Sequence, residues 1–347
     1  MTSLPLHGGA IDLAARHYGI PDDQWLDLST GINPLAWPLP AISPAAWQKL
    51  PLHADLIRLQ QAAAGYYRVA NPDHIACAPG TQALIQIIPS LIRGHKRGRK
   101  VLIAGPTYGE HGNVWRQAGF DVTEPHIPAA TRASHLRAAI KDCDVMVLVN
   151  PNNPDGAVIS PDDLMEIAQG VAAKDGWLIL DEAFADTDPA GSLCPHIATL
   201  DRTLVLRSFG KFFGLAGLRL GFAISQPDII AALATRLGPW AVSGPAMEIA
   251  TRALHDRDWQ DRTRHRLANA AKRLDDLIIG NGVGEPVGGT DLFRLYRGQD
   301  MTGWYDRLAC HGILVRAFDY APDWLRFGLP GSEADWQKLQ SALINPA

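Results

Sequence analysis

The chain has 347 residues, about twice the length of a typical domain, so we expect a large domain and a smaller one. Hydrophobic residues make up 47% of the sequence and charged residues 20%, which excludes a disordered or fibrous protein. The formal net charge of -4 does not indicate a nucleic-acid partner. No apolar stretch approaches the ~20 residues that a membrane-spanning helix needs. We therefore expect neither nucleic acid nor a membrane as a partner.

The cysteines and the N-terminus indicate the compartment. The four cysteines are spread along the chain without a CxxC pair or a Cys/His ligand spacing, so the sequence predicts neither a metal site nor a disulfide framework. The first residues lack the basic region and apolar core of a secretory signal. We therefore expect a cytoplasmic protein.

Between residues 75 and 224 a short apolar run repeatedly ends in a polar or glycine-containing turn and leads into a helical stretch. This pattern predicts an α/β fold with a mainly parallel central sheet, because strands covered on both faces are almost continuously apolar. Helical patterns at 82–92 and 164–173 lie between runs, and Ser160 and Pro161 supply a start signal for the second. The apolar runs are 75–78, 101–104, 145–149, 177–180, 204–206 and 220–224.

The pattern changes near both ends of the chain. Residues 1–40 are rich in glycine and proline and predict an extended N-terminal arm that packs on the active site. Residues 41–236 form the predicted large domain. After a segment with glycine and proline, a helical pattern at 245–277 and short strands near 291–296 and 313–316 predict a smaller α+β domain at 237–347.

In an open α/β sheet, ligands bind beyond the carboxyl ends of the strands. Gly80, Thr81 and Gln82 follow the first run and open a helix, whose free backbone N–H groups favour an anion. Tyr108 follows the second run and offers an aromatic face, and Asn153 lies in the polar loop after the third. Each of these places has a purely structural alternative: a helix cap at 80–82, a core tyrosine at Tyr108 and an ordinary turn at Asn153.

The fourth and fifth runs carry the more specific signals. Asp181 emerges from an apolar strand, and a protonated pyridine nitrogen would pair with this carboxylate; a structural aspartate bound by backbone N–H groups is the alternative. Ser208 and Lys211 follow the fifth run, and Arg219 comes eight residues after Lys211. Lysine forms an imine with an aldehyde, while serine and arginine suit a phosphate.

In the order and spacing of these motifs, the chain resembles the fold-type I pyridoxal-phosphate enzymes of the aminotransferase superfamily over nearly its whole length. The resemblance implies that Lys211 carries pyridoxal 5'-phosphate (PLP) as a Schiff base. It also implies a homodimer with active sites at the subunit interface. The implied cofactor-binding residues are Gly80, Thr81, Gln82, Tyr108, Asn153, Asp181, Ser208, Lys211 and Arg219.

Features outside these motifs resemble most closely the threonine-phosphate decarboxylases of cobalamin biosynthesis, and next the histidinol-phosphate aminotransferases. They are residues 7–9, 29–35 and 239–243, together with Phe184, where aminotransferases commonly have a tyrosine. The resemblance implies a small phosphorylated amino acid as the substrate. The implied substrate-binding residues are His7, Gly8, Gly31, Asn153, Arg316 and Arg326.

Decarboxylation and transamination both remain open, because the sequence does not show which bond of the substrate α-carbon stands perpendicular to the ring. Two other classes are disfavoured. A non-catalytic regulator would not need Lys211, and a P-loop would have Ser or Thr directly after this lysine, where the chain has Phe212. The chain also departs from its relatives at 50–53, which lacks the tyrosine that often reaches the partner subunit's cofactor phosphate.

Overall fold

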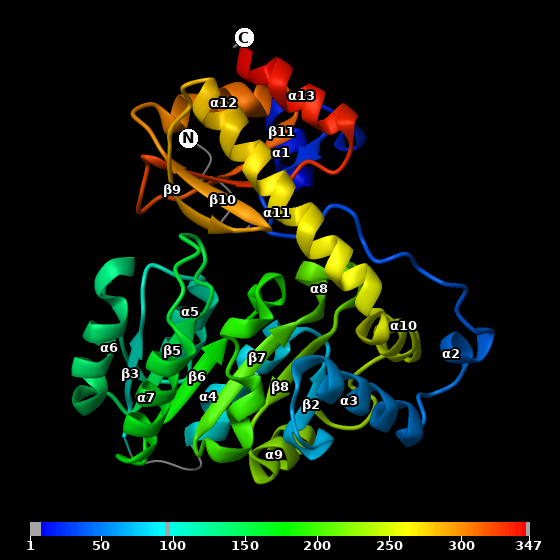
Figure 1. Ribbon diagram of the computed structural model, residues 1–347, viewed down its shortest axis with the longest axis vertical. Coiled ribbons are helices and arrows are strands. Elements are labelled where there is room, and N and C mark those ends of the chain that lie inside the picture. The colour runs from blue at the N-terminus through cyan, green and yellow to red at the C-terminus, as the bar shows by residue number, and fades with distance from the viewer. Residues whose placement is uncertain (1–7, 94–97, 345–347) are drawn as a thin grey trace. The chain divides into compact units, whose positions relative to one another are not determined.

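The computed structural model describes residues 8–93 and 98–344, and the chain divides into two compact units (Figure 1). Unit 1 comprises Met1–Ala36, Pro154–Gly156 and Gln260–Ala347. Unit 2 comprises Trp37–Asn153 and Ala157–Trp259. Residues 237–259, which the sequence pattern assigns to the smaller domain, therefore cluster with unit 2. None of the helices in the described residues is both long and apolar enough to cross a membrane.

Unit 2 is built around a seven-stranded sheet in the order β2-β8-β7-β6-β5-β3-β4. Its strands are β2 (Ile75–Ala78), β3 (Lys100–Ile103), β4 (Asp121–Thr123), β5 (Val145–Val149), β6 (Trp177–Asp181), β7 (Thr203–Ser208) and β8 (Gly221–Ile224). The predicted mainly parallel sheet is confirmed, and β8 is the exception because it pairs antiparallel with both β2 and β7. This reversal places Gly221 opposite Ala78 and Ser208, at the edge where β2 and β7 end.

The helices of unit 2 are α2 (Pro44–Gln48), α3 (His53–Tyr67), α4 (Thr81–Arg93), α5 (Gly109–Gln117), α6 (Arg132–Ala139), α7 (Pro161–Ala172), α8 (Phe209–Phe212), α9 (Pro227–Leu237) and α10 (Gly244–His255). The predicted start of α7 is confirmed, because the Ser160 hydroxyl accepts a hydrogen bond from the Asp163 N–H and Pro161 takes the first helical position. The core of the unit joins the apolar faces of α4, α5 and α9 to the sheet, with Leu84, Trp115 and Leu233 almost fully buried.

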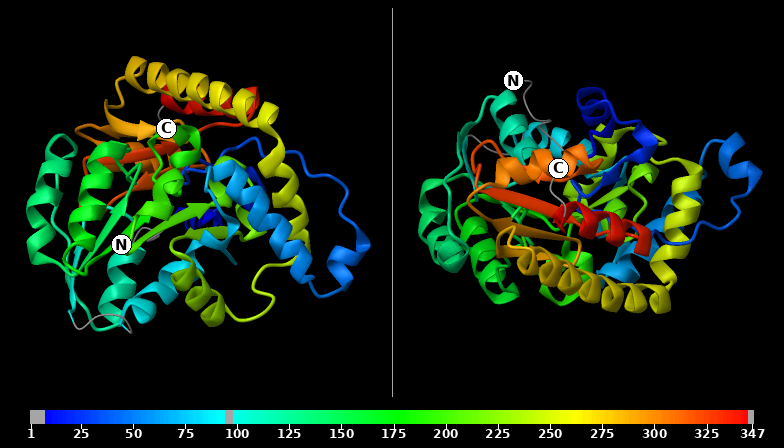
Figure 2. Two further views of the ribbon diagram at one scale, coloured as in Figure 1. Left: turned by 60° about the horizontal axis from the view of Figure 1, so that its bottom comes forward. Right: turned by 90° about the horizontal axis from the view of Figure 1, so that it is seen from above.

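Unit 1 contains a four-stranded antiparallel sheet in the order β12-β13-β10-β9. Its strands are β9 (Glu285–Thr290), β10 (Phe293–Arg297), β12 (Arg316–Ala317) and β13 (Trp324–Gly328), and its C-terminal helices are α12 (Met301–Cys310) and α13 (Glu333–Ile344). The predicted long helix is two helices, α10 and α11 (Arg257–Gly280), which are separated at Asp256. The second part of α11 lies along the sheet of unit 1, where Asp275 accepts hydrogen bonds from Arg294 and Tyr296 of β10 (Figure 2).

The N-terminal segment differs from the predicted extended arm, because part of it is built into unit 1. Residues Ile11–Tyr18 form helix α1, and β1 (Leu26–Asp27) pairs in parallel with β11 (Ile313–Leu314). The Tyr18 hydroxyl donates to Asp306 of α12 at 2.9 Å. These partners lie almost 300 residues away along the chain, so the local sequence does not indicate them.

Candidate active site

Lys211 lies in α8, directly after the end of β7, as the sequence pattern predicts. Its Nζ lies 5.5 Å from the centroid of the Phe184 ring, which is buried. Phe209 and Phe212 on either side of the lysine are also fully buried. The amine therefore lies near the face of one aromatic ring, in a segment whose neighbouring side chains are apolar.

Asp181 ends β6, is 4% exposed and accepts a hydrogen bond from the Ala183 N–H at 3.0 Å. Its Oδ2 lies 3.0 Å from Nε2 of His111, a fully buried side chain of α5. The His111 ring packs edge-on against Tyr108, with 6.1 Å between the ring centroids. The sequence reading missed His111, although its position three residues after Tyr108 places it on a related face of the helix.

The turn between β2 and α4 forms a cradle for an anion. Gly80 has a left-handed φ of 86°, and a Cβ on this residue would lie 2.9 Å from Nη2 of Arg219. A Cβ on Gly221 would lie 2.5 Å from the backbone nitrogen of Thr81. Two glycines therefore let the first N–H groups of α4 and the Arg219 guanidinium gather closely, an arrangement that suits a phosphate.

The side chains of Gln82 and Tyr108 belong to one hydrogen-bonded group. Gln82 Nε2 donates to Glu110 at 2.8 Å, and the Tyr108 hydroxyl donates to Gln82 Oε1 at 3.3 Å. Burial, together with the charges of Glu110 and Asp181, raises the pKa of Tyr108 to about 12, so its phenol stays protonated at neutral pH. Because the Gln82 amide is engaged with two side chains, its backbone N–H is the group suited to a phosphate.

The remaining predicted residues of unit 2 lie at the ends of neighbouring strands. Ser208 ends β7 and pairs with Gly221 of β8. Asn153 is half-buried in the loop after β5. This loop is fixed by Asn150, whose side chain accepts from the Ile159 N–H at 2.8 Å and donates to the Ile159 carbonyl at 3.3 Å.

Unit 1 contains a separate group of cationic side chains. Arg316 of β12 lies directly opposite Arg326 of β13 in the sheet register. Arg326 is buried, and its Nη2 donates to the Ser29 carbonyl at 2.7 Å. Burial and the charge of Arg316 lower the pKa of Arg326 to about 10, so it remains cationic at neutral pH. Two neighbouring arginines, one buried and one half-buried, favour an anionic ligand.

The backbone beside these arginines comes from the N-terminal segment. A Cβ on Gly8 would lie 2.5 Å from the Ser29 carbonyl oxygen, so this position requires the absence of a side chain. The Gly9 N–H donates to the Ser29 hydroxyl at 2.8 Å. Gly31, two residues after Ser29, is also buried. The structure thus brings Gly8 and Arg326 to the same serine, while His7 lies outside the described residues.

The chemical groups of unit 2 fit PLP. A buried carboxylate oriented by His111 suits a protonated ring nitrogen, and the glycine-lined start of α4 with Arg219 suits the phosphate. The Lys211 amine suits the aldehyde. Among residues 8–93 and 98–344 there is no group of three or more His, Cys, Asp or Glu side chains that could hold a metal ion.

Comparison with known proteins agrees with this donor set. Residues 26–343 match the family model of the class I and II aminotransferases. The chain is 42% identical to the threonine-phosphate decarboxylase of Pseudomonas aeruginosa over 340 residues, which cover 97% of both chains. It is also 42% identical to a threonine-phosphate decarboxylase of Sinorhizobium sp over 343 residues, which cover 99% of this chain and 98% of the relative.

A solved structure shows the same fold. The histidinol-phosphate aminotransferase of Sinorhizobium meliloti in complex with PLP has a TM-score of 0.79 and 24% sequence identity, and the match covers 98% of this chain and 94% of the other. The predicted fold-type I architecture is thereby confirmed. The chain belongs to the aminotransferase class I and II family of PLP-dependent enzymes.

Proposed function

We propose that this chain catalyses the PLP-dependent decarboxylation of L-threonine O-3-phosphate to (R)-1-amino-2-propanol phosphate, a reaction of cobalamin biosynthesis. The observation that carries the proposal is the 42% identity to two threonine-phosphate decarboxylases over nearly the full length of each chain. The Arg316 and Arg326 pair supports it, because the substrate carries both a carboxylate and a phosphate.

Lys211, Asp181 and the start of α4 would hold the cofactor. When bound, PLP supplies an electron sink for the bond that breaks at the substrate α-carbon. Asp181, oriented by His111, would accept a hydrogen bond from the ring nitrogen and keep it protonated. The backbone N–H groups of Thr81 and Gln82 would bind the phosphate.

The substrate's orientation decides which bond breaks, so the anion-binding residues would set the reaction. Arg316 and Arg326 would bind the anionic groups of the substrate, with Gly8, Gly31 and Asn153 as further contacts. By binding these anionic groups, the two arginines would orient the substrate carboxylate for loss as carbon dioxide, and the Lys211 amine would be the group that returns a proton to the α-carbon. Phe184 offers no hydroxyl to the cofactor, unlike the tyrosine common in aminotransferases.

The test is to incubate the purified holoprotein with threonine phosphate, and to measure carbon dioxide and the amine product. We expect both products without a keto acid, no turnover by Lys211→Ala, and normal turnover by the matched surface variant Lys174→Ala. Histidinol phosphate with 2-oxoglutarate tests the alternative, an aminotransferase acting on a phosphorylated amino acid. Keto-acid formation that depends on 2-oxoglutarate, without release of carbon dioxide, would contradict the decarboxylase proposal.

We also propose that the protein forms a homodimer. Its location in the cytoplasm stays a prediction. The support for the dimer is a set of exposed apolar side chains in two segments, one that contains α2 and one that leads into α10. The two segments contact each other, because a Cβ on Gly244 would lie 2.4 Å from the Ala46 carbonyl oxygen. Exposed apolar groups of this kind typically mark protein interfaces. These side chains, called the α2 patch here, are Leu39, Trp47, Leu50, Leu52 and Trp240.

A further inference from the structure

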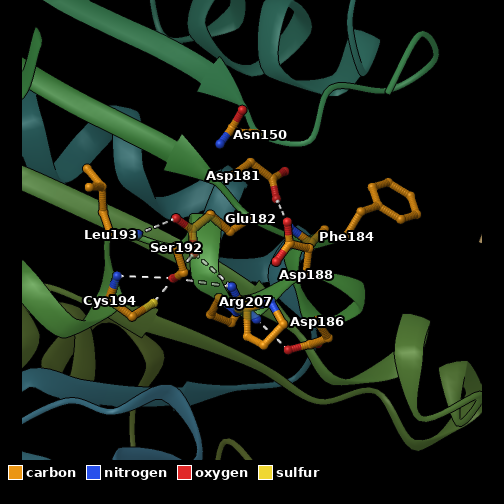
Figure 3. A network of polar contacts seen from close by, with 12 residues as sticks. Asn150, Asp181, Glu182, Phe184, Asp186, Asp188, Ser192, Leu193, Cys194 and Arg207 are labelled. Carbon is orange, nitrogen blue, oxygen red and sulfur yellow. Dashed lines mark hydrogen bonds and ion pairs between the residues drawn. The ribbon is translucent and has the colours of Figure 1, made fainter. Parts of the chain in front are cut away.

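A buried group of three charged side chains lies close to the proposed cofactor residue Asp181 but includes none of the proposed cofactor residues (Figure 3). Arg207 of β7 donates from Nη1 to Glu182 at 2.7 Å and from Nη2 to Asp186. All three side chains are at most 2% exposed. The guanidinium also lies over the Tyr67 ring, with 4.7 Å from Cζ to the ring centroid. Burying three charges is costly, so this group calls for a specific role.

The geometry of the group depends on arginine. The two Nη atoms reach different carboxylates, one at each end of a five-residue loop that follows β6. The ammonium of a lysine could be centred on only one of them. Glu182 is fixed further, because it accepts hydrogen bonds from the Ser192 hydroxyl and from the Leu193 N–H.

Phe184 lies at the middle of the loop that Arg207 holds at both ends. Its ring is buried and lies 5.5 Å from Nζ of Lys211, and its carbonyl accepts a hydrogen bond from the Thr187 hydroxyl at 3.1 Å. The face of an aromatic ring stabilises a nearby cation, and the strength of this interaction depends on the position of the ring. The ring near Lys211 therefore belongs to a loop whose two ends are both bonded to Arg207.

We propose that Arg207 is a positioning residue that acts on Lys211 through Phe184. By holding Glu182 and Asp186, it fixes the Phe184 ring beneath the lysine nitrogen and favours the protonated form of that nitrogen. The inference rests on the proposed role of Lys211 as the residue that binds PLP. The ionic group would therefore influence the protonation of the Lys211 nitrogen, in addition to any contribution to folding.

The first experiment compares Arg207→Lys with Arg132→Lys. Arg132 is a matched control, because it is also buried in unit 2, at 3% exposed, but donates to the Ile127 carbonyl. In each holoprotein the visible absorbance of bound PLP is titrated with pH, and the melting temperature is measured. We expect Arg207→Lys to lower the pH midpoint by about half a unit, which corresponds to the loss of one cation–π contact. Arg132→Lys should lower only the melting temperature.

A double-mutant cycle tests the path through Phe184. Phe184→Leu alone should lower the midpoint, and adding Arg207→Lys to it should cause no further shift, because the residue through which Arg207 acts is gone. If Arg207→Lys does not fold, Asp186→Asn takes its place in the cycle, since it keeps an acceptor for Arg207 and leaves the Glu182 pair intact.

Two results would overturn the inference. One is an unchanged midpoint in Arg207→Lys with a melting temperature lowered as in Arg132→Lys, which would make the group purely structural. The other is a double mutant whose midpoint shift equals the sum of the two single-variant shifts, because Arg207 would then act independently of Phe184. Failure of the proposed PLP-binding role of Lys211 is separate and visible in the wild-type protein, where borohydride would leave no pyridoxyl group on this residue.

Discussion

Single residues of this protein act through the environment that burial gives them. The Asp181 carboxylate is almost inaccessible to water and has His111 at 3.0 Å, so its orientation is fixed by a neighbouring side chain. At Arg326, burial disfavours the charge of the guanidinium and the charge of Arg316 adds repulsion. An anionic ligand would relieve both costs at Arg326.

The lowered pKa of Arg326 predicts how substrate binding depends on pH. As the pH rises through about 10, the guanidinium loses its proton and with it the attraction for an anion. We expect the KM for threonine phosphate to rise by up to about tenfold for each further pH unit, with a smaller change in kcat. Steady-state kinetics across this range measure the effect. Arg326→Gln should have a high KM that does not rise further above about pH 10. A KM of the wild-type protein that does not change across this pH range would contradict the role given to Arg326.

At the scale of elements, the site depends on how β8 meets the turn between β2 and α4. Because β8 runs against its two neighbours, its first residue lies beside the first turn of α4. Only a residue without a side chain fits there, since a Cβ on Gly221 would lie 2.5 Å from the Thr81 nitrogen and 2.8 Å from the Gly80 carbonyl carbon. The cradle for the phosphate is thus a property of two strands and a helix together.

Gly221→Ala should therefore weaken PLP binding and lower the melting temperature, because the new methyl group meets backbone atoms that cannot rotate away. We expect at least about a tenfold loss of PLP affinity, measured by titration of the apoprotein. Gly65→Ala is the matched control: Gly65 lies inside α3, and a Cβ there would meet no atom within 4 Å. This control should gain about 0.5–1 kcal/mol of stability with unchanged PLP affinity. Equal effects of both substitutions would contradict the crowding at Gly221.

At the scale of the whole molecule, the α2 patch sets the expected assembly. Trp47 is 69% exposed, Leu50 64%, Leu52 65% and Trp240 59%, although all four side chains are large and apolar. Large apolar groups left in water are unfavourable, and a second copy of the chain would bury them. The same segment contains residues 50–53, where the tyrosine that often reaches the partner subunit is absent.

Charged substitutions in the α2 patch should separate the subunits. We expect the double variant Trp47→Asp and Leu50→Asp to shift the protein from dimer to monomer, because each aspartate would be buried without a partner charge in the interface. Sedimentation velocity over a range of protein concentrations measures this shift. Val158→Asp changes another exposed apolar residue of unit 2, 60% exposed, and should remain dimeric. A monomeric wild-type protein would contradict the proposal.

The sequence by itself determined six of the seven strands of the large sheet and the places of Asp181 and Lys211, because an apolar run followed by a polar turn is a local pattern. It did not predict β4, a short strand at the edge of the sheet whose residues are mostly exposed. It also placed the start of α7 correctly, since Ser160 and Pro161 act within one helical turn. Tertiary structure alone decided the reversal of β8, the contact of His111 with Asp181, and the pairing of Arg316 with Arg326. It likewise built α1 and β1 into unit 1, where the sequence predicted an extended arm. Each of these features joins residues that are distant along the chain or adds a contact across two elements, and such pairings depend on packing that no local pattern records.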